Sequence, residues 1–425
     1  MTDAPRSGTA PSSTADTPSE IELKFRLDPA RAEAVFAALS GEGGQSRTLT
    51  SIYYDTPRRA LSKAGMALRV RRDGERWVQT LKSEALANGD MGRGEWETEV
   101  AGATPDLASL KKTPAWKSLA NAKPLAPLFT VKVDRRIACR KAGGAEIEIA
   151  LDRGEVAADG RTSPITELEL ELKSGETSAL IGYAAKARRT HGLALSFGTK
   201  SGRGMALLER TGERAVKFRP PRLKPGLSAG GGFKAIARAA LEQIVGNAER
   251  LAETPGPEVV HQMRVGVRRL RSALATFKPV VEDRRIGAIK AELKWLTGEL
   301  DSARNLDVML AGAYRRATRR KSDRTGLVDL GRRLRAARGG AYVRARSAAE
   351  SERFADLVME TLAWIECGPW TKADAPGAKA RQKPLADFAA KALARRWKKI
   401  ARACAKLETL STEQRHHVRI DAKKL

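Results

Sequence analysis

The sequence predicts a multi-domain α and β chain, in which an antiparallel β barrel with helices is followed by an all-α helical bundle. Three observations support this fold class. Apolar residues recur at every second position in most of the first half, and at every third or fourth position in the second. A segment rich in Pro, Gly and basic residues separates the halves. Part of the second half repeats itself, which is typical of a pseudo-symmetric bundle.

The domain boundaries follow from these changes in composition. Residues 1–19 are polar, with neither a basic start nor an apolar core, and are expected to form a disordered tail. The β domain is assigned to residues 20–210, the linker to residues 211–232 and the helical domain to residues 233–425. A chain of 425 residues with 42% apolar content is long enough for such packed cores.

Charge is divided unevenly between the halves. The net charge is +28, and residues 211–425 carry 46 Lys and Arg against 23 Asp and Glu. The helical half is therefore expected to attract polyanions. The three cysteines form no zinc or disulfide pattern, and no apolar run reaches the roughly 18 to 20 residues that span a bilayer. The sequence thus indicates a cytoplasmic protein with reduced thiols and no membrane partner.

Charged residues alternate with apolar ones along the predicted strands of the first half. Because alternate side chains of a strand point to the same face, each strand has one charged and one apolar face. Closing about eight such strands into a barrel would turn the charged faces inward, making a polar tunnel in place of a side-chain core. The charged positions are Glu20, Glu22, Lys24, Arg69, Arg71, Glu146, Glu148, Glu167, Glu169, Glu171 and Lys173.

The two charge signs would have separable roles inside such a tunnel. Carboxylates are the hard oxygen ligands that Mg²⁺ or Mn²⁺ prefers, whereas Arg and Lys donate to phosphate oxygens. A metal-bound triphosphate satisfies both sets. The candidate metal ligands are Glu20, Glu22, Glu148, Asp152, Glu167, Glu169 and Glu171. The candidate phosphate ligands are Lys24, Arg69, Arg71, Lys82, Arg93 and a member of the pair Arg135 and Arg136, between which the pattern does not decide; we select Arg135.

Several motifs occur in a fixed order along this domain. They are Glu20-x-Glu22-x-Lys24, LRVRR at 68–72, TLK at 80–82, RGEWE at 93–97, EIALDRGEV at 148–156, ELELELKSGE at 167–176 and Lys200-x-x-Arg203. Together they resemble the CYTH domain of the triphosphate tunnel metalloenzymes, over nearly all of residues 20–210. The resemblance implies a tunnel barrel, a divalent metal, and hydrolysis or cyclisation of triphosphate compounds. It adds Lys200 and Arg203 to the substrate ligands and implies catalytic roles for Glu20, Glu22, Lys24, Glu169 and Glu171.

Other interpretations stay open for this domain. Alternating Glu and Lys on an antiparallel sheet also form cross-strand ion pairs on a solvated face. A tunnel could also bind triphosphate with little turnover, as in a scaffold protein, or act as an adenylyl cyclase or a thiamine triphosphatase. We favour an enzyme that hydrolyses inorganic triphosphate, because the sequence offers no clear pocket for a base or a thiazole ring.

The helical half contains an internal repeat. Residues 233–270 align without a gap with residues 388–425, which matches Phe233 with Phe388. The second copy stops at Leu425, whereas the first continues for more than a hundred residues before the second begins. We therefore expect the second repeat to be truncated, with apolar helix faces of the first copy left uncovered.

Cations crowd on one helix face of each repeat. Spacings of three and four residues place these side chains on the same face, where they repel one another unless an anion lies among them. The positions are His261, Arg264, Arg268 and Arg271 in the first copy and His416, Arg419 and Lys423 in the second. A further segment, LDSARNLDV at 300–308, holds Arg304 and Asp307 one turn apart, and they are expected to form an ion pair.

This half resembles the CHAD domain. The similarity is carried by H-x-x-R-V-x-x-R-R-L-R at 261–271, LDSARNLDV at 300–308 and H-x-x-R-I-x-x-K-K-L at 416–425. It implies binding of inorganic polyphosphate, and through it association with polyphosphate granules. DNA or RNA is the alternative polyanion, although few aromatic residues are available to stack on bases. The implied polyphosphate ligands are His261, Arg264, Arg268, Arg269, Arg271, His416, Arg419, Lys423 and Lys424.

Overall fold

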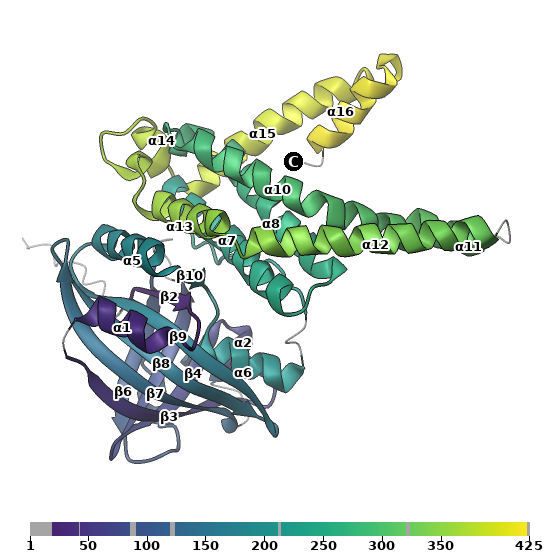
Figure 1. The fold of residues 1–425 in the computed structure, drawn as a ribbon. Coiled ribbons are helices and arrows are strands. Elements are labelled where there is room, and N and C mark those ends of the chain that lie inside the picture. The colour runs from purple at the N-terminus through teal and green to yellow at the C-terminus, as the bar shows by residue number, and fades with distance from the viewer. Residues whose placement is uncertain are drawn as a thin grey trace, which may run out of the picture.

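The computed structural model describes residues 19–41, 43–85, 91–119, 124–210, 214–319 and 324–422. Figure 1 shows a barrel of strands and, above it, a helical domain from which two helical arms project. The predicted fold class, an antiparallel sheet followed by a helical region, is confirmed. Within the described ranges, no helix is both long and apolar enough to cross a membrane.

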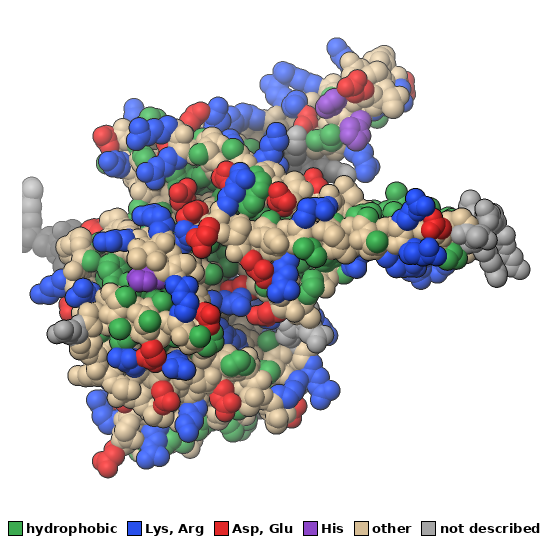
Figure 2. Space-filling model, viewed as in Figure 1, with side chains coloured by type: hydrophobic (Ala, Val, Ile, Leu, Met, Phe, Trp, Pro, Cys, Tyr) green, Lys and Arg blue, Asp and Glu red, His purple; other side chains and the backbone are tan. Residues whose placement is uncertain are grey.

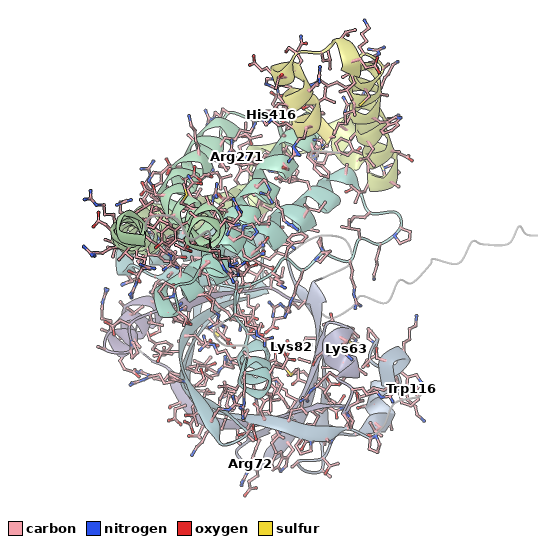
Figure 3. The ribbon with its side chains drawn as sticks, turned by 90° about the vertical axis from the view of Figure 1, so that its right-hand side faces the viewer. Lys63, Arg72, Lys82, Trp116, Arg271 and His416 are labelled. Carbon is pink, nitrogen blue, oxygen red and sulfur yellow. The ribbon has the colours of Figure 1, made fainter. Side chains whose placement is uncertain are left out.

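All strands in the described part of the chain belong to one antiparallel sheet, in the order β1-β6-β5-β4-β3-β7-β8-β9-β2-β10. β1 and β2 are parts of one N-terminal strand, interrupted at Ile21, and they pair with β6 and β9 from opposite ends of this order. The sheet therefore curves round until its ends meet at this strand (Figure 3). The strands are β1 Ser19–Glu20, β2 Glu22–Arg26, β3 Gln45–Asp55, β4 Met66–Asp73, β5 Arg76–Ala85, β6 Arg93–Val100, β7 Ala126–Ala142, β8 Ala145–Ala158, β9 Arg161–Ser174 and β10 Ala194–Ser196.

The described sheet contains the predicted eight strands and one short strand more. Within the described residues the sheet has ten strand segments. Counting β1 and β2 as one strand leaves eight around the barrel and β10, which pairs with β2. β10 has three residues, which is less than two periods of alternation, so its sequence carries no strand signal.

The apolar faces of the strands point outward and are covered by helices. Leu23 and Phe25 of β2 and Leu168 and Leu170 of β9 are buried against α1 (Ala32–Ser40) and α5 (Thr177–His191). On another side of the barrel, Leu68 and its neighbours pack with three short helices. These are α2 Ala60–Lys63, α3 Leu107–Leu110 and α4 Trp116–Leu119. The predicted alternation of charged and apolar faces is thus present, with the charged face inside.

One end of the barrel interior is nevertheless apolar. Val131 and Val133 lie on the same face of β7 as Arg135, and they pack with Val156 of β8 and Ile165 of β9. The inward face of these strands therefore changes from charged to apolar along its length. The prediction of a polar interior in place of a side-chain core is therefore wrong for this end of the barrel.

Helix α6 (Lys200–Glu209) covers the apolar end. Its Met205, Leu207 and Leu208 pack against the apolar cluster. Gly204 lies so close to Phe129 of β7 that a Cβ would come within 2.3 Å of the phenyl ring. Only glycine lets the helix approach this closely. We call the apolar cluster together with α6 the closed end of the barrel.

The helical domain begins at Ala229, four residues before the predicted boundary, and Ser228 caps its first helix. Its main helices run back and forth, and α10 and α12 form one projecting arm in Figure 1. The elements are α7 Ala229–Glu253, α8 Pro257–Thr276, α9 Lys278–Val281, α10 Ile286–Met309, η1 Leu310–Tyr314, α11 Arg315–Arg319, α12 Arg324–Ala349, α13 Glu352–Cys367, η2 Pro369–Thr371, α14 Ala378–Gln382, α15 Leu385–Cys404, η3 Leu407–Thr409 and α16 Thr412–Ala422.

The repeat is visible in the fold. The aligned residues place α15 and α16 in the positions that α7 and α8 hold in the first copy. The matched rings of Phe233 and Phe388 both lie against Phe277, with ring centroids 5.6 and 4.9 Å away. Phe277 therefore joins the two copies through aromatic contacts.

Exposed apolar side chains lie elsewhere than expected. α7 and α8 of the first copy bury their apolar faces, so the expectation of uncovered faces is wrong for this helix pair. In the second copy, Leu393 and Trp397 of α15 are 49% and 61% exposed. Val308 of α10 and Val343 of α12 are also exposed, on the arm that follows the first copy.

The two domains share a buried contact. Arg188 of α5 is only 2% exposed and bridges to Glu352 and Asp356 at the start of α13. Its guanidinium also donates to the backbone oxygen of Glu352 at 3.1 Å. The apolar cluster beneath this contact contains residues of both domains. Arg188 therefore ties the helical domain to the outer layer of the barrel.

Replacing Arg188 with Ala is expected to lower the free energy of unfolding by about 2 kcal/mol, because it removes hydrogen bonds to charged partners at a buried position. Denaturant titration followed by circular dichroism measures this. Arg189→Ala is the matched control, since Arg189 is the exposed neighbour on the same helix, and it is expected to change stability by less than about 0.5 kcal/mol. Equal effects of the two substitutions would contradict the interdomain role.

Candidate functional site

Three carboxylates meet inside the barrel, next to the closed end. Asp152 of β8 lies opposite Glu167 of β9 in the strand register, and Glu169 follows on the same face of β9. Each offers an oxygen atom within 4.8 Å of the others, and all three residues are buried. We call this group the acidic trio. Its oxygen atoms are of the kind that divalent metal ions prefer.

Lys200, the first residue of α6, reaches into the acidic trio. Its Nζ lies 2.6 Å from Asp152 and 2.9 Å from Glu169, and it also donates to Glu167. Thr199 caps the helix by accepting from the N–H of Gly202 at 2.9 Å, which fixes the backbone at this point. Lys200 and Arg203 were predicted as phosphate ligands. Arg203 contacts the backbone oxygen of Pro164 and, at 3.2 Å, Glu167.

Further cations surround Glu169. Lys24 of β2 donates to Glu169 and, at 3.0 Å, to Glu22. Arg135 of β7 donates two hydrogen bonds of 2.6 Å to Asp152 and a third to Glu169. Burial alone would raise the pKa of Glu169, but these cations and Lys200 outweigh burial and hold its pKa well below the usual range. Glu169 is therefore a buried anion held by three cations.

Of the pair Arg135 and Arg136, the structure turns Arg135 inward. Arg136 lies on the opposite face of β7, where it donates to Glu33 of α1 and lies 4.7 Å from the ring of Phe36. The alternation of the strand requires this difference, because adjacent residues point to opposite faces.

A second ion-pair group lies on β1, β5 and β6. Lys82 donates to Glu20 and lies 3.2 Å from Glu95. Figure 3 shows Lys82 inside the ring of strands. Glu95 also lies 3.8 Å from Arg69 of β4. Glu95 was missed as a site residue, although it alternates with Arg93 in the RGEWE motif and thus shares its inward face.

Arg71 of β4 is an inward cation that pairs with no described carboxylate. Its Nε donates to the Ser51 hydroxyl at 3.3 Å. Burial and the neighbouring cations Arg69 and Arg135 lower the pKa of Arg71 to about 10. Nearby, the Nε of Arg69 is buried without a hydrogen-bond partner among the described residues. This wall of the barrel therefore has donors and positive charge in excess.

Exposure rises steadily along β9 from the closed end. The side chains of Glu167, Glu169 and Glu171 are 2%, 9% and 24% exposed. Lys173 pairs with Glu171 at 2.7 Å and with Glu148 at 3.4 Å near this open end. Burial raises the pKa of Glu171. The interior thus opens to solvent on the side of Glu171 and Glu148.

The seven predicted metal ligands are therefore not one group. Asp152, Glu167 and Glu169 form the acidic trio. Glu20 and Glu22 bind Lys82 and Lys24, and Glu148 and Glu171 share Lys173. Arg93, a predicted phosphate ligand, lies opposite Glu20 in the register of β1 and β6.

The predicted cationic face of the helical domain is built by α8 and α10 together. Arg264 of α8 pairs with Asp301 of α10 at 2.6 Å, while Arg268 is exposed. Partial burial and the guanidinium of Arg304, with smaller contributions from Arg268 and Arg264, lower the pKa of His261. Arg304 was not predicted to be part of this face.

The expected ion pair between Arg304 and Asp307 does not form. Asp307 instead accepts hydrogen bonds from Arg338 at 2.6 Å and Tyr342 at 2.8 Å, both on α12. Asp307 faces the neighbouring helix, whereas Arg304 faces α8. One turn of separation makes two residues neighbours on a helix surface but does not decide which helix each will contact.

The other predicted cations differ in their surroundings. Arg269 turns away to lie 4.3 Å from the ring of Phe218 in the linker. Arg271 and the α16 residues His416 and Arg419 are exposed, and Figure 3 shows Arg271 and His416 in the helical domain, away from the barrel interior. In Figure 2 basic side chains are spread over both projecting arms, among apolar and acidic ones. Lys423 and Lys424 lie outside the described residues.

Two known protein families match the chain, one in each domain. The family model of the CYTH domain matches residues 18–204, and that of the CHAD domain matches residues 235–425. The chain carries a CYTH domain followed by a CHAD domain. The two matches cover both the barrel with its acidic trio and the helical domain with its repeat.

Similar proteins include a curated relative and several solved structures. An inorganic triphosphatase from Haemophilus influenzae is 28% identical over 193 residues, which are 44% of this chain and 54% of that protein. The chain thus spans about half the length of this relative. The solved CHAD domain of the plant Ricinus communis is 28% identical, with 50% and 68% of the two chains covered and a TM-score of 0.43. The Hippeastrum protein HpAC1, described as having a dominant triphosphatase activity, is 19% identical over 44% and 95%, with a TM-score of 0.34.

Glu169→Gln in the CYTH domain is expected to lower stability at pH 7 by about 3 kcal/mol, because it leaves buried cations without their shared anion. The folded-state pKa of Glu169 is depressed. Its stabilisation is therefore complete above the unfolded-state pKa of about 4.3 and is lost as the pH falls through the lower folded-state value. Urea unfolding of both proteins between pH 3 and 7 checks this.

The difference between the wild type and Glu169→Gln should therefore shrink at acid pH. Glu155→Gln, an exposed carboxylate on the outer face of β8, provides the control and should leave stability unchanged throughout. A difference for Glu169→Gln that stays constant down to pH 3 would argue against an ionised, cation-held Glu169.

Proposed function

We propose that the CYTH domain is a metal-dependent triphosphatase that hydrolyses inorganic triphosphate. The observation that carries this proposal is the pairing of two unlike surfaces in one barrel. The acidic trio offers buried oxygen ligands, while Arg71 and Arg69 offer donors that no described carboxylate satisfies within hydrogen-bonding distance. A short polyanion carrying a divalent cation complements both surfaces.

Arg71 and Arg69 are the residues to which we assign the phosphate chain. A guanidinium is a planar donor that can bind two phosphate oxygens at once, and it stays charged even when buried. The lowered pKa of Arg71 reflects mutual repulsion with Arg69 and Arg135 as well as burial, and a phosphate group would relieve this repulsion. Lys82 would contact the same chain from β5.

The acidic trio suits Mg²⁺ or Mn²⁺ in both chemistry and charge. Its three carboxylates already surround a cation in this structure, the ammonium group of Lys200. When bound, a divalent ion would act as a Lewis acid that withdraws charge from the phosphate oxygens. Asp152, Glu167 and Glu169 would hold it.

Hydrolysis requires a water oxygen to bond to the terminal phosphorus while the bond from that phosphorus to the bridging oxygen breaks. The products are orthophosphate and pyrophosphate. Arg71, Arg69 and Lys82 would stabilise the charge that develops on the leaving pyrophosphate. Glu171, whose pKa is raised by burial, is the carboxylate to which we assign the proton released by water, because a base is most effective with a pKa near the working pH.

For the CHAD domain we propose binding of inorganic polyphosphate. Support comes from the cationic face of α8 and α10, where His261, Arg268 and Arg304 lie together, and from the excess of basic residues in this half. Such binding would bring the enzyme to polyphosphate granules. The three cysteines are free thiols, which fits the cytoplasm as the location we propose.

Arg71→Met is expected to lower kcat/KM for triphosphate hydrolysis about 100-fold, because it removes a buried donor that acts on the phosphate chain. Phosphate release with Mg²⁺ or Mn²⁺ is the measurement. Arg72→Met is the matched control: Arg72 is the next residue on β4, and in Figure 3 it lies outside the ring of strands. Its activity should equal that of the wild type.

The same assay, run on triphosphate, long polyphosphate, ATP and thiamine triphosphate, tests the substrate class. Highest kcat/KM for inorganic triphosphate supports the proposal. Preference for ATP or thiamine triphosphate would replace it with nucleotide or thiamine chemistry, and binding without turnover would indicate a scaffold.

Arg268→Ala combined with Arg304→Ala is expected to weaken long-chain polyphosphate binding by about tenfold or more, and the loss should diminish as salt is raised. Fluorescence anisotropy with labelled polyphosphate measures this. Arg332→Ala with Arg333→Ala removes the same charge from α12, where both residues pair with Asp329, and should have little effect. Tighter binding of duplex DNA than of polyphosphate at equal charge would overturn the assignment.

A further inference from the structure

We propose that Lys200 is a built-in counter-ion of the acidic trio, which holds its carboxylates together in the metal-free protein and must leave them when a divalent ion binds. This inference rests on the proposed metal site. It concerns a step that the proposed hydrolysis does not itself require, namely an exchange between an ammonium group and a metal ion.

The position of the ammonium group supports this exchange. Among the described cations, only Lys200 contacts every member of the acidic trio, at 2.6 Å from Asp152, 2.9 Å from Glu169 and within hydrogen-bonding distance of Glu167. Arg135 contacts Asp152 and Glu169 alone, and Lys24 contacts only Glu169 of the three. The Nζ of Lys200 therefore lies where the oxygen atoms of the trio converge.

The fixed backbone and flexible side chain of Lys200 also favour its exchange with a metal ion over a permanent ion pair with the acidic trio. Its backbone is fixed by the Thr199 cap and by the contact of Gly204 with Phe129. The side chain, in contrast, is an unbranched chain of four carbons that ends in a point charge without preferred direction. Arg135 holds Asp152 through two parallel hydrogen bonds, a geometry that rotation would break. Lys200 can retract while Arg135 stays.

Three buried carboxylates without a central cation would repel one another strongly. The metal-free protein therefore needs Lys200, and the metal competes with it. Once displaced, the ammonium group remains inside the barrel and becomes free to contact a phosphate oxygen. Metal binding and phosphate binding should consequently favour each other, because the first releases a cation for the second.

The test measures Mn²⁺ binding by isothermal titration calorimetry, without triphosphate. Lys200→Met should bind Mn²⁺ about tenfold or more tightly than the wild type, because a competing charge is gone. Lys200→Arg retains the charge and should stay within about threefold of the wild type. Lys132→Met is the matched control: Lys132 is an exposed lysine on the outer face of β7, and its removal should leave the affinity unchanged.

Thermal unfolding provides the second readout. Metal-free Lys200→Met should melt below the wild type, and saturating Mn²⁺ should raise its melting temperature by more than it raises that of the wild type. If Lys200→Met does not fold, Lys200→Gln takes its place, since its amide can still donate to the carboxylates. Mn²⁺ affinity that is equal to or weaker than that of the wild type in the folded variant would overturn the inference.

Hydrolysis by the wild type separates this inference from the proposed function. If the wild type hydrolyses triphosphate and Lys200→Met binds Mn²⁺ with unchanged affinity, the counter-ion role is wrong and the enzyme assignment stands. Tighter Mn²⁺ binding by Lys200→Met in a protein that hydrolyses no triphosphate supports the counter-ion role and removes the enzyme assignment.

Discussion

The structure of the barrel depends on the buried charge of Glu169. Its carboxylate accepts from Lys24 of β2, Arg135 of β7 and Lys200 of α6, so one side chain connects three separate elements across the interior. An isolated carboxylate in this position would be unstable, and so would the three cations without it. The interior is therefore a mutually dependent network, in which each charge is tolerated because of the others.

Much of this interior could be predicted from alternation alone. Glu22, Lys24 and Glu169 lie on the charged face because a strand has a period of two. The apolar closed end could not be predicted in the same way. Val131 and Val133 share that face with Arg135, and periodicity shows which side of a strand faces inward but not how deep along the barrel each residue lies. Depth depends on strand tilt and on α6, which the local sequence does not encode.

Prediction from the sequence has the same limit in the helical domain. The repeat predicted that α15 and α16 would copy α7 and α8, and the matched phenylalanines meet at Phe277. The ion-pair partner of an individual charged residue could not be predicted. Asp307 pairs with Arg338 on another helix and not with Arg304, which is one turn away on the same helix. Helical spacing limits which neighbours are possible on the same helix, whereas contacts between helices depend on how the bundle is assembled.

The N-terminal strand that joins both ends of the sheet has a consequence for folding. Lys24 and Glu169, which meet across β2 and β9, are 145 residues apart in the sequence. Barrel closure is therefore a step of high contact order, and such long-range pairing is slow compared with the formation of local hairpins such as β4 and β5. During synthesis, β2 cannot pair with β9 until β9 has left the ribosome. The charged interior is thus assembled late, and a partly folded chain exposes these acidic and basic strands as unpaired edges.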